Sequence, residues 1–140
     1  FHDLGHICAQ YGKAEHMDGY GRLGHETVAA QLLRDKGFSE KIASLVEKHV
    51  EAKRYLCARS SAYYDKLSGA SKNTLRFQGG PMSAEEVVAF ESDPLHSLYI
   101  KLRAWDELAK EPDKPVPDLN IFRDMARKHL QLCKLMSKRS

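Results

Sequence analysis

The residues of this sequence that could carry chemistry begin with an adjacent pair, His2-Asp3. A carboxylate can bridge two metal ions while a neighbouring imidazole binds one of them. His25, His49 and Asp106 follow at wide spacing. Taken singly, each has an ordinary alternative: a helix start for His25, a satisfied imidazole for His49 and a solvated helix charge for Asp106. Taken together as HD…H…H…D, they indicate a metal site assembled from several segments.

Candidate anion-binding side chains accompany these candidate ligands at helical spacing. The pairs are His49 with Lys53, Asp106 with Arg103 and, if that segment is helical, His2 with His6. Residues three or four apart share one helix face, so each helix would present a ligand and an anion donor side by side. Ser71 and Thr74, three residues apart, could add two hydroxyl donors. The alternatives are ordinary solvated charge for Lys53 and Arg103, and turn capping for Ser71 and Thr74.

The composition is that of one globular domain. The chain has 140 residues, of which 42% are hydrophobic and 29% charged, an ordinary balance for a single core. A net charge of +3 is too small to indicate nucleic-acid binding. No apolar run reaches the roughly 18–20 residues of a membrane span. Three cysteines without CxxC spacing favour a reducing compartment. We therefore expect one domain over 1–140, a cytoplasmic location, and neither nucleic acid nor a membrane as partner.

Hydrophobic periodicity predicts an all-α, compact single-domain fold, because no segment alternates as a strand does. Gly37 would end the first helix, Ser39 would cap the second, Ser83 and Glu86 form a capping box, and Asp93 precedes Pro94 at a further helix start. The predicted helices cover 24–36, 40–57, a stretch from 83, 93–108 and 118–135, with short helical turns over 59–82.

Several residues without a chemical pattern are expected to be structural. Trp105 and Phe90 are predicted to lie in the core, and the four methionines to serve packing: Met17, Met82, Met125 and Met136. Residues 18–21 are predicted to form a turn, with a substrate contact at the rim of the site as the functional alternative. The remaining histidines, His16, His96 and His129, are expected to be surface or satisfied imidazoles.

The spacing HD…H…H…D resembles the HD-domain superfamily of helical metalloproteins. Four further segments, HVEAKRYLC, LSGASKNTLRFQGGPM, EEVVAFESDP and KLRAWDELAK, resemble the HD-domain oxygenases of phosphonate degradation. Their diagnostic parts here are H-x3-K at His49, S-x2-T at Ser71, the QGGPM turn and R-x2-D at Arg103. The resemblance implies a mixed-valent di-iron enzyme (Fe2+/Fe3+) that cleaves a carbon–phosphorus bond with O2.

The resemblance also implies a role for each position. His2 and Asp106 would bind the first iron, Asp3 would bridge both, and His25 and His49 would bind the second. The phosphonate oxygens would be held by His6, Lys53, Ser71, Thr74 and Arg103. Among these residues, His2, Asp3 and Lys53 are the expected catalytic groups.

One departure from the family pattern bears on the first iron. The family has another iron-binding histidine on a helix before the HD pair, and nothing precedes Phe1 here. We therefore expect an N-terminally truncated domain whose first iron lacks one ligand, with reduced affinity.

The expected reaction is O2-dependent cleavage of a 1-hydroxyphosphonate. The family substrate 2-amino-1-hydroxyethylphosphonate would give glycine and phosphate, and its trimethylammonium analogue glycine betaine and phosphate. A metal-dependent phosphohydrolase acting on a nucleotide or phosphomonoester is the alternative, because most HD domains hydrolyse phosphate esters. A degenerate domain that binds phosphonate or phosphate without turnover is a second alternative.

Overall fold

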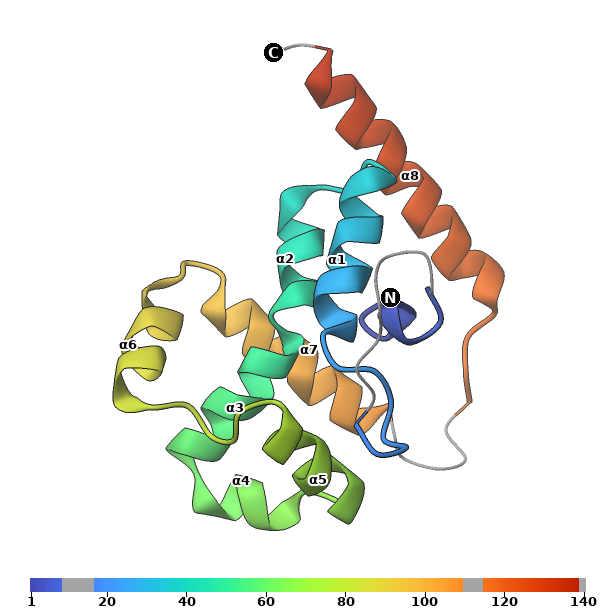
Figure 1. The fold of residues 1–140 in the computed structure, drawn as a ribbon. Helices are drawn as coiled ribbons and strands as arrows, with labels where there is room; N and C mark the ends of the chain where they lie inside the picture. Colours follow the sequence, from blue (N-terminus) through green and yellow to red (C-terminus); the bar gives the residue numbers. More distant parts are fainter. Residues whose placement is uncertain (9–16, 110–114, 139–140) are drawn as a thin grey trace.

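The elements of this protein are arranged so that five of them meet around one cavity. The structure, a computed structural model, describes residues 1–8, 17–109 and 115–138. Within those ranges it contains eight α-helices, one short 3-10 helix and no strand (Figure 1), which confirms the predicted all-α class. The elements are η1 Leu4–His6, α1 His25–Asp35, α2 Glu40–Glu47, α3 His49–Arg59, α4 Ser61–Lys66, α5 Gly69–Phe77, α6 Ala84–Ser92, α7 His96–Leu108 and α8 Leu119–Ser137.

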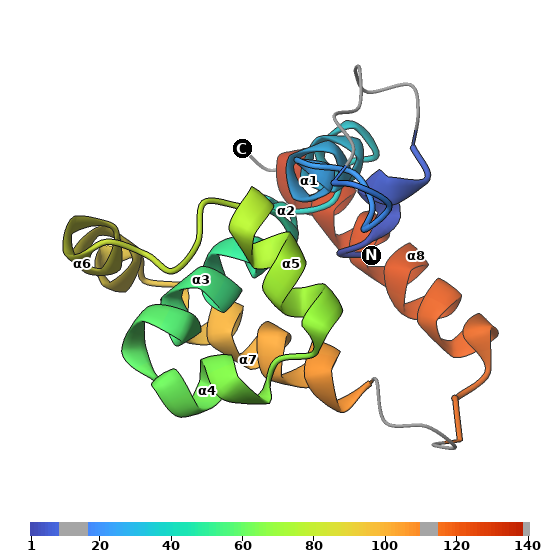
Figure 2. The same cartoon turned by 60° about the horizontal axis from the view of Figure 1, so that its bottom comes forward.

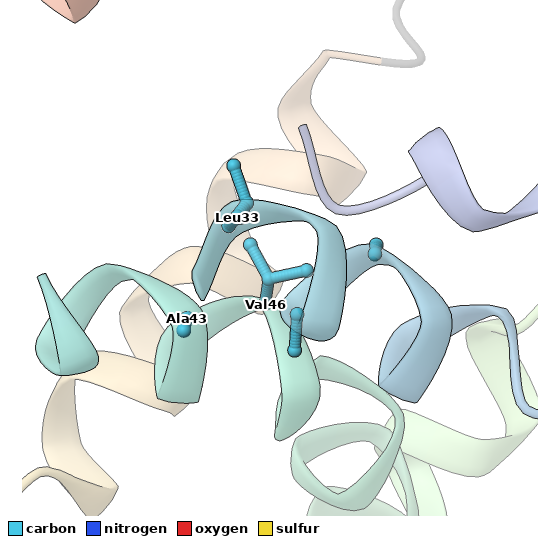
Figure 3. Close-up of a cluster of buried hydrophobic side chains, with 5 residues drawn as sticks. Leu33, Ala43 and Val46 are labelled. Carbon is cyan, nitrogen blue, oxygen red and sulfur yellow. The ribbon is translucent and has the colours of Figure 1, made fainter. Parts of the chain in front are cut away.

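Helices α1 and α2 form a hairpin whose apolar faces make the first core cluster. Gly37 allows the sharp turn between them, because its φ of +85° favours glycine. Leu33 of α1 packs beside Ala43 and Val46 of α2 (Figure 3), and Leu4 of η1 packs on the same cluster. The His2-Asp3 segment is therefore anchored against α1 by a hydrophobic contact.

Helix α3 lies at the centre and packs against α7 (Figure 2). On one side it contacts a cluster that includes Phe90 and Tyr99, and on the other a cluster of Cys57, Leu67 and Leu75. The second cluster packs α5 against α3, since Leu75 of α5 is only 1% exposed and belongs to the same cluster as Cys57 of α3. These contacts bring α3, α5 and α7 together along one side of the cavity.

The predicted helix 40–57 is broken in the structure. Helix α2 ends at Glu47 and α3 begins at His49, with Lys48 in a turn between them. The His49 ring nitrogen Nδ1 lies 2.7 Å from the Val46 carbonyl, so a side chain takes an acceptor that backbone N–H groups use elsewhere in a helix. The break places His49 at the first position of α3.

Of the predicted helix starts, two are confirmed with their side-chain caps. Ser83 and Glu86 form the capping box, and Asp118 caps α8 by accepting from the Asn120 N–H. Ser39 occupies the N-cap position of α2 without a side-chain capping bond. Asp93 accepts from the Leu95 N–H in a turn, and α7 begins only at His96.

Three predictions of burial are wrong. Trp105 is 56% exposed, Met125 61% and Met136 70%. Met125 and Met136 belong to α8, which has no buried residue and runs along the outside of the molecule (Figure 1). His129 holds α8 against the turn between α1 and α2 by accepting from the Ser39 N–H and stacking on Phe38.

His16 lies outside the described residues. In the described part of the chain, no helix combines the length and apolar character needed to cross a membrane.

Candidate metal and anion site

All ten residues predicted for the site line a single cavity of about 130 Å³. They come from the segment around η1, from the starts of α1 and α3, and from the facing sides of α3, α5 and α7. The ten are His2, Asp3, His6, His25, His49, Lys53, Ser71, Thr74, Arg103 and Asp106. Residues more than 100 positions apart in the sequence thus share one cavity, as the spacing argument expected.

His25 and His49 are both buried, at 4% and 5% exposure. Their Nε2 atoms are 3.1 Å apart. His25 Nδ1 lies 3.0 Å from the Arg22 carbonyl and His49 Nδ1 2.7 Å from the Val46 carbonyl. A carbonyl only accepts, so both rings carry their proton on Nδ1 and point Nε2 lone pairs at each other.

This arrangement fits a metal ion. Two facing lone pairs repel unless a ring takes a second proton or a cation lies between them. Burial opposes the proton, since it lowers the pKa of His49 to about 4. Imidazole nitrogens bound to one ion at about 2.0–2.1 Å lie roughly 3 Å apart, and a backbone carbonyl on the other ring nitrogen is the usual support for a metal ligand.

Asp3 lies between two groups of potential ligands. Its Oδ2 atom is 3.1 Å from His2 Nε2, and its Oδ1 atom is 3.8 Å from His25 Nε2. His2 Nε2 is also 3.3 Å from Asp106 Oδ1. One carboxylate oxygen of Asp3 therefore lies close to His2, whose ring also reaches Asp106, and the other lies closer to His25. A bridging carboxylate needs such an arrangement, with one oxygen toward each group of ligands.

The charges at His2 favour a cation. Hydrogen bonds to Asp106 and Asp3 raise the pKa of His2 to about 9. The hydrogen bond from His2 lowers the pKa of Asp3 to about 2. Both shifts have one cause: two carboxylates close to one imidazole stabilise positive charge between them. A metal ion would supply that charge in place of the proton.

His6 is positioned as a donor to an anion. Donor atoms of Asp3, His6 and His25 lie within 4.8 Å of one another, so His6 is close enough to be a metal ligand. However, His6 Nδ1 accepts from the Arg22 backbone N–H at 3.1 Å. The neutral ring therefore carries its proton on Nε2, which faces Asp3, and offers an N–H there.

Two buried cations also line the cavity. Lys53 is 5% exposed and donates to Thr74 Oγ1 at 3.0 Å. Arg103 is 6% exposed and donates to Asp106 Oδ2 at 2.8 Å. Cations are rarely buried to this extent without a functional or paired role. Together with the Ser71 and Thr74 hydroxyls, they form a group of donors suited to a dianion.

Several contributors to the site carry no signal in the sequence. The Arg22 backbone orients both His6 and His25. A side chain at Gly5 would place its Cβ 1.8 Å from the His25 carbonyl oxygen, so only glycine permits this approach of η1 to α1. Tyr20, in the predicted 18–21 turn, lines the cavity. Met17, Val50 and Gln78 line it as well.

The sequence of this chain is similar to those of known proteins, two of which are named as dioxygenases. No protein-family model matches the chain. The chain is 40% identical over 127 residues to (1-hydroxy-2-(trimethylamino)ethyl)phosphonate dioxygenase (glycine-betaine-forming) of Leisingera caerulea, covering 91% of this chain and 64% of that protein. It is 37% identical over 121 residues to hydroxymethylphosphonate dioxygenase of Gimesia maris, covering 86% of this chain and 60% of that protein.

An uncharacterized protein of Acanthamoeba polyphaga mimivirus is 38% identical over 129 residues, covering 92% of this chain and 59% of that protein. The chain thus spans about three fifths of the length of the curated relatives it matches. Over most of its own length, it is similar to two proteins named as phosphonate dioxygenases.

Proposed function

We propose that this chain forms the metal- and phosphonate-binding part of an O2-dependent oxygenase that cleaves the carbon–phosphorus bond of a 1-hydroxyphosphonate. The observation that carries the proposal is the cavity itself, where a His/Asp cluster faces two buried cations. The similarity to two named phosphonate dioxygenases supports the same reaction class.

The proposed cofactor is a pair of iron ions held by five side chains. His2 and Asp106 would hold the first, His25 and His49 the second, and Asp3 both, since each Asp3 oxygen faces one of these groups. When bound, the iron would supply the activation of O2 that protein side chains cannot provide.

The other side chains would bind and orient the substrate. Lys53 and Arg103 would neutralise the phosphonate dianion, and their burial strengthens the effect of their charge. The Ser71 and Thr74 hydroxyls and the His6 Nε2–H would donate to its oxygens. Because Lys53 and His49 share one face of α3, and Arg103 and Asp106 share one face of α7, the phosphonate would lie directly beside the metal ligands.

The proposed substrates are 2-amino-1-hydroxyethylphosphonate, which would give phosphate and glycine, and its trimethylammonium analogue, which would give phosphate and glycine betaine. The relatives' printed names include the second reaction and a smaller substrate, hydroxymethylphosphonate. All three are therefore compounds to test.

The decisive experiment measures phosphate release from these phosphonates by iron-loaded protein, with and without O2. Release that requires O2 is expected. Hydrolysis of a phosphomonoester under nitrogen, also with manganese or cobalt, would instead identify a phosphohydrolase. Phosphonate binding without any turnover would identify a binding domain.

A further inference from the structure

Arg103 is held by acceptors on two sides. Its Nη1 donates to Asp106 Oδ2 at 2.8 Å, and its Nε donates at 3.1 Å both to the Tyr63 hydroxyl and to Glu107 Oε1. Asp106 and Glu107 belong to α7, whereas Tyr63 comes from α4. A guanidinium presents its N–H groups in one rigid plane, so contacts at both Nε and Nη1 determine the direction of the whole group.

Tyr63 and Glu107 also bind each other. Burial raises the pKa of Tyr63, so its hydroxyl keeps its proton. The hydroxyl donates that proton to Glu107 and accepts from Arg103 Nε. The three side chains therefore form a closed hydrogen-bonded triangle, in which each contact supports the other two.

Two members of this triangle, Tyr63 and Glu107, lie outside the cavity that the candidate metal ligands line. Tyr63 and Glu107 line a second cavity of about 270 Å³, which shares Arg103 and Ser71 with the first. The guanidinium thus lies in the wall between two spaces. Without the contact at Nε, it would have room to turn toward the second cavity, away from the candidate phosphonate site.

We propose that Tyr63 and Glu107 are positioning residues that hold the Arg103 guanidinium toward the phosphonate side of this wall. The inference rests on the proposed function, because it assumes that Arg103 binds the phosphonate. Neither residue lines the cavity of the candidate metal ligands, so each would act through Arg103.

The test is the Kd of methylphosphonate for the metal-loaded protein under nitrogen, measured by calorimetry for Tyr63→Phe, Glu107→Gln and Arg103→Lys. Tyr63→Phe keeps the ring and removes only the hydroxyl. We expect it to raise the Kd about three- to tenfold, the effect of one lost hydrogen bond. Glu107→Gln should act in the same direction. Metal content and melting temperature should stay close to those of the unsubstituted protein.

Two comparisons make the test specific. Tyr64→Phe, at the exposed neighbour on α4, should leave the Kd unchanged. In an Arg103→Lys background, Tyr63→Phe should cause no further rise in the Kd of methylphosphonate, because the effect of Tyr63 passes through the guanidinium. Turnover should show a higher KM for Tyr63→Phe with a nearly unchanged kcat.

The outcomes separate the two proposals. Wild-type affinity in Tyr63→Phe, with weakened binding in Arg103→Lys, overturns the positioning role and leaves the proposed function standing. The positioning role is also overturned if the losses of methylphosphonate affinity from Tyr63→Phe and Arg103→Lys add in the double variant. If the unsubstituted protein neither binds methylphosphonate nor releases phosphate, the proposed function fails, and the inference fails with it.

Discussion

His25 and His49 point their Nε2 atoms at each other across 3.1 Å, while a backbone carbonyl accepts from Nδ1 of each ring. The fold therefore buries two nitrogen lone pairs that repel each other in the absence of a cation. Such an arrangement is stable when a positive charge lies between the rings, and this makes metal binding measurable as protein stability.

Metal removal should lower the melting temperature. An ion present at about 100 times its Kd stabilises the folded state by about 2.7 kcal/mol, which for a domain of this size corresponds to roughly 5–10 °C. Calorimetry of iron-loaded and chelator-treated protein would measure the difference. The shift should be smaller in His49→Gln, which removes a ligand of the second ion, and unchanged in His96→Gln. His96 is the first residue of α7 and does not line the cavity. An undiminished shift in His49→Gln would contradict the proposed ligand role.

Asp3→Ala should abolish binding of both ions, since each Asp3 oxygen faces one of the two ligand groups. Metal content per chain, determined by elemental analysis after gel filtration, is the measurement. Asp65→Ala, at an exposed carboxylate on α4, is the matched control. Two irons per chain in Asp3→Ala would remove the bridging role.

Lys53→Met should weaken anion binding and leave metal content constant. A hydrogen bond from a charged donor contributes about 1.5–3 kcal/mol, so the Kd of methylphosphonate should rise roughly 10- to 100-fold. Lys48→Met is the control, because Lys48 pairs with Glu51 near the surface and such pairs contribute at most about 1 kcal/mol. If Lys53→Met lost iron instead, the separation of anion and metal sides would be wrong.

Gly5→Ala should disturb the metal site although Gly5 binds nothing. Its new Cβ would lie 1.8 Å from the His25 carbonyl oxygen, so η1 must move away from α1 and carry His2 and Asp3 with it. We expect a stability loss of about 1–3 kcal/mol and reduced metal content.

The control for this steric prediction is Gly69→Ala at the start of α5. A Cβ there meets nothing within 4 Å, so the free energy of unfolding should change by less than about 0.5 kcal/mol. Equal metal content in both glycine variants would show that η1 can accommodate the methyl group.

The sequence by itself predicted the features that depend on neighbouring residues. The Ser83–Glu86 capping box and the Asp118 cap form within one helical turn, so their residue types are sufficient to indicate them. The same locality explains why Lys53 and His49 could be assigned to one helix face. The ten residues that line the cavity were also predicted from the sequence, since the resemblance to phosphonate-degrading oxygenases implied positions that local patterns could not connect. Their roles as ligands and anion donors stay predictions.

Only the tertiary structure decided how those residues meet. The orientation of His25 depends on the Arg22 carbonyl, the approach of η1 depends on Gly5, and the direction of Arg103 depends on Tyr63 of another helix. Helix α8 illustrates the same limit, because Met125 and Met136 were predicted to serve packing and both lie exposed. Hydrophobic periodicity indicates which face of a helix is apolar. Whether that face is buried, and where its side chains point, depends on which distant segments of the chain pack against it.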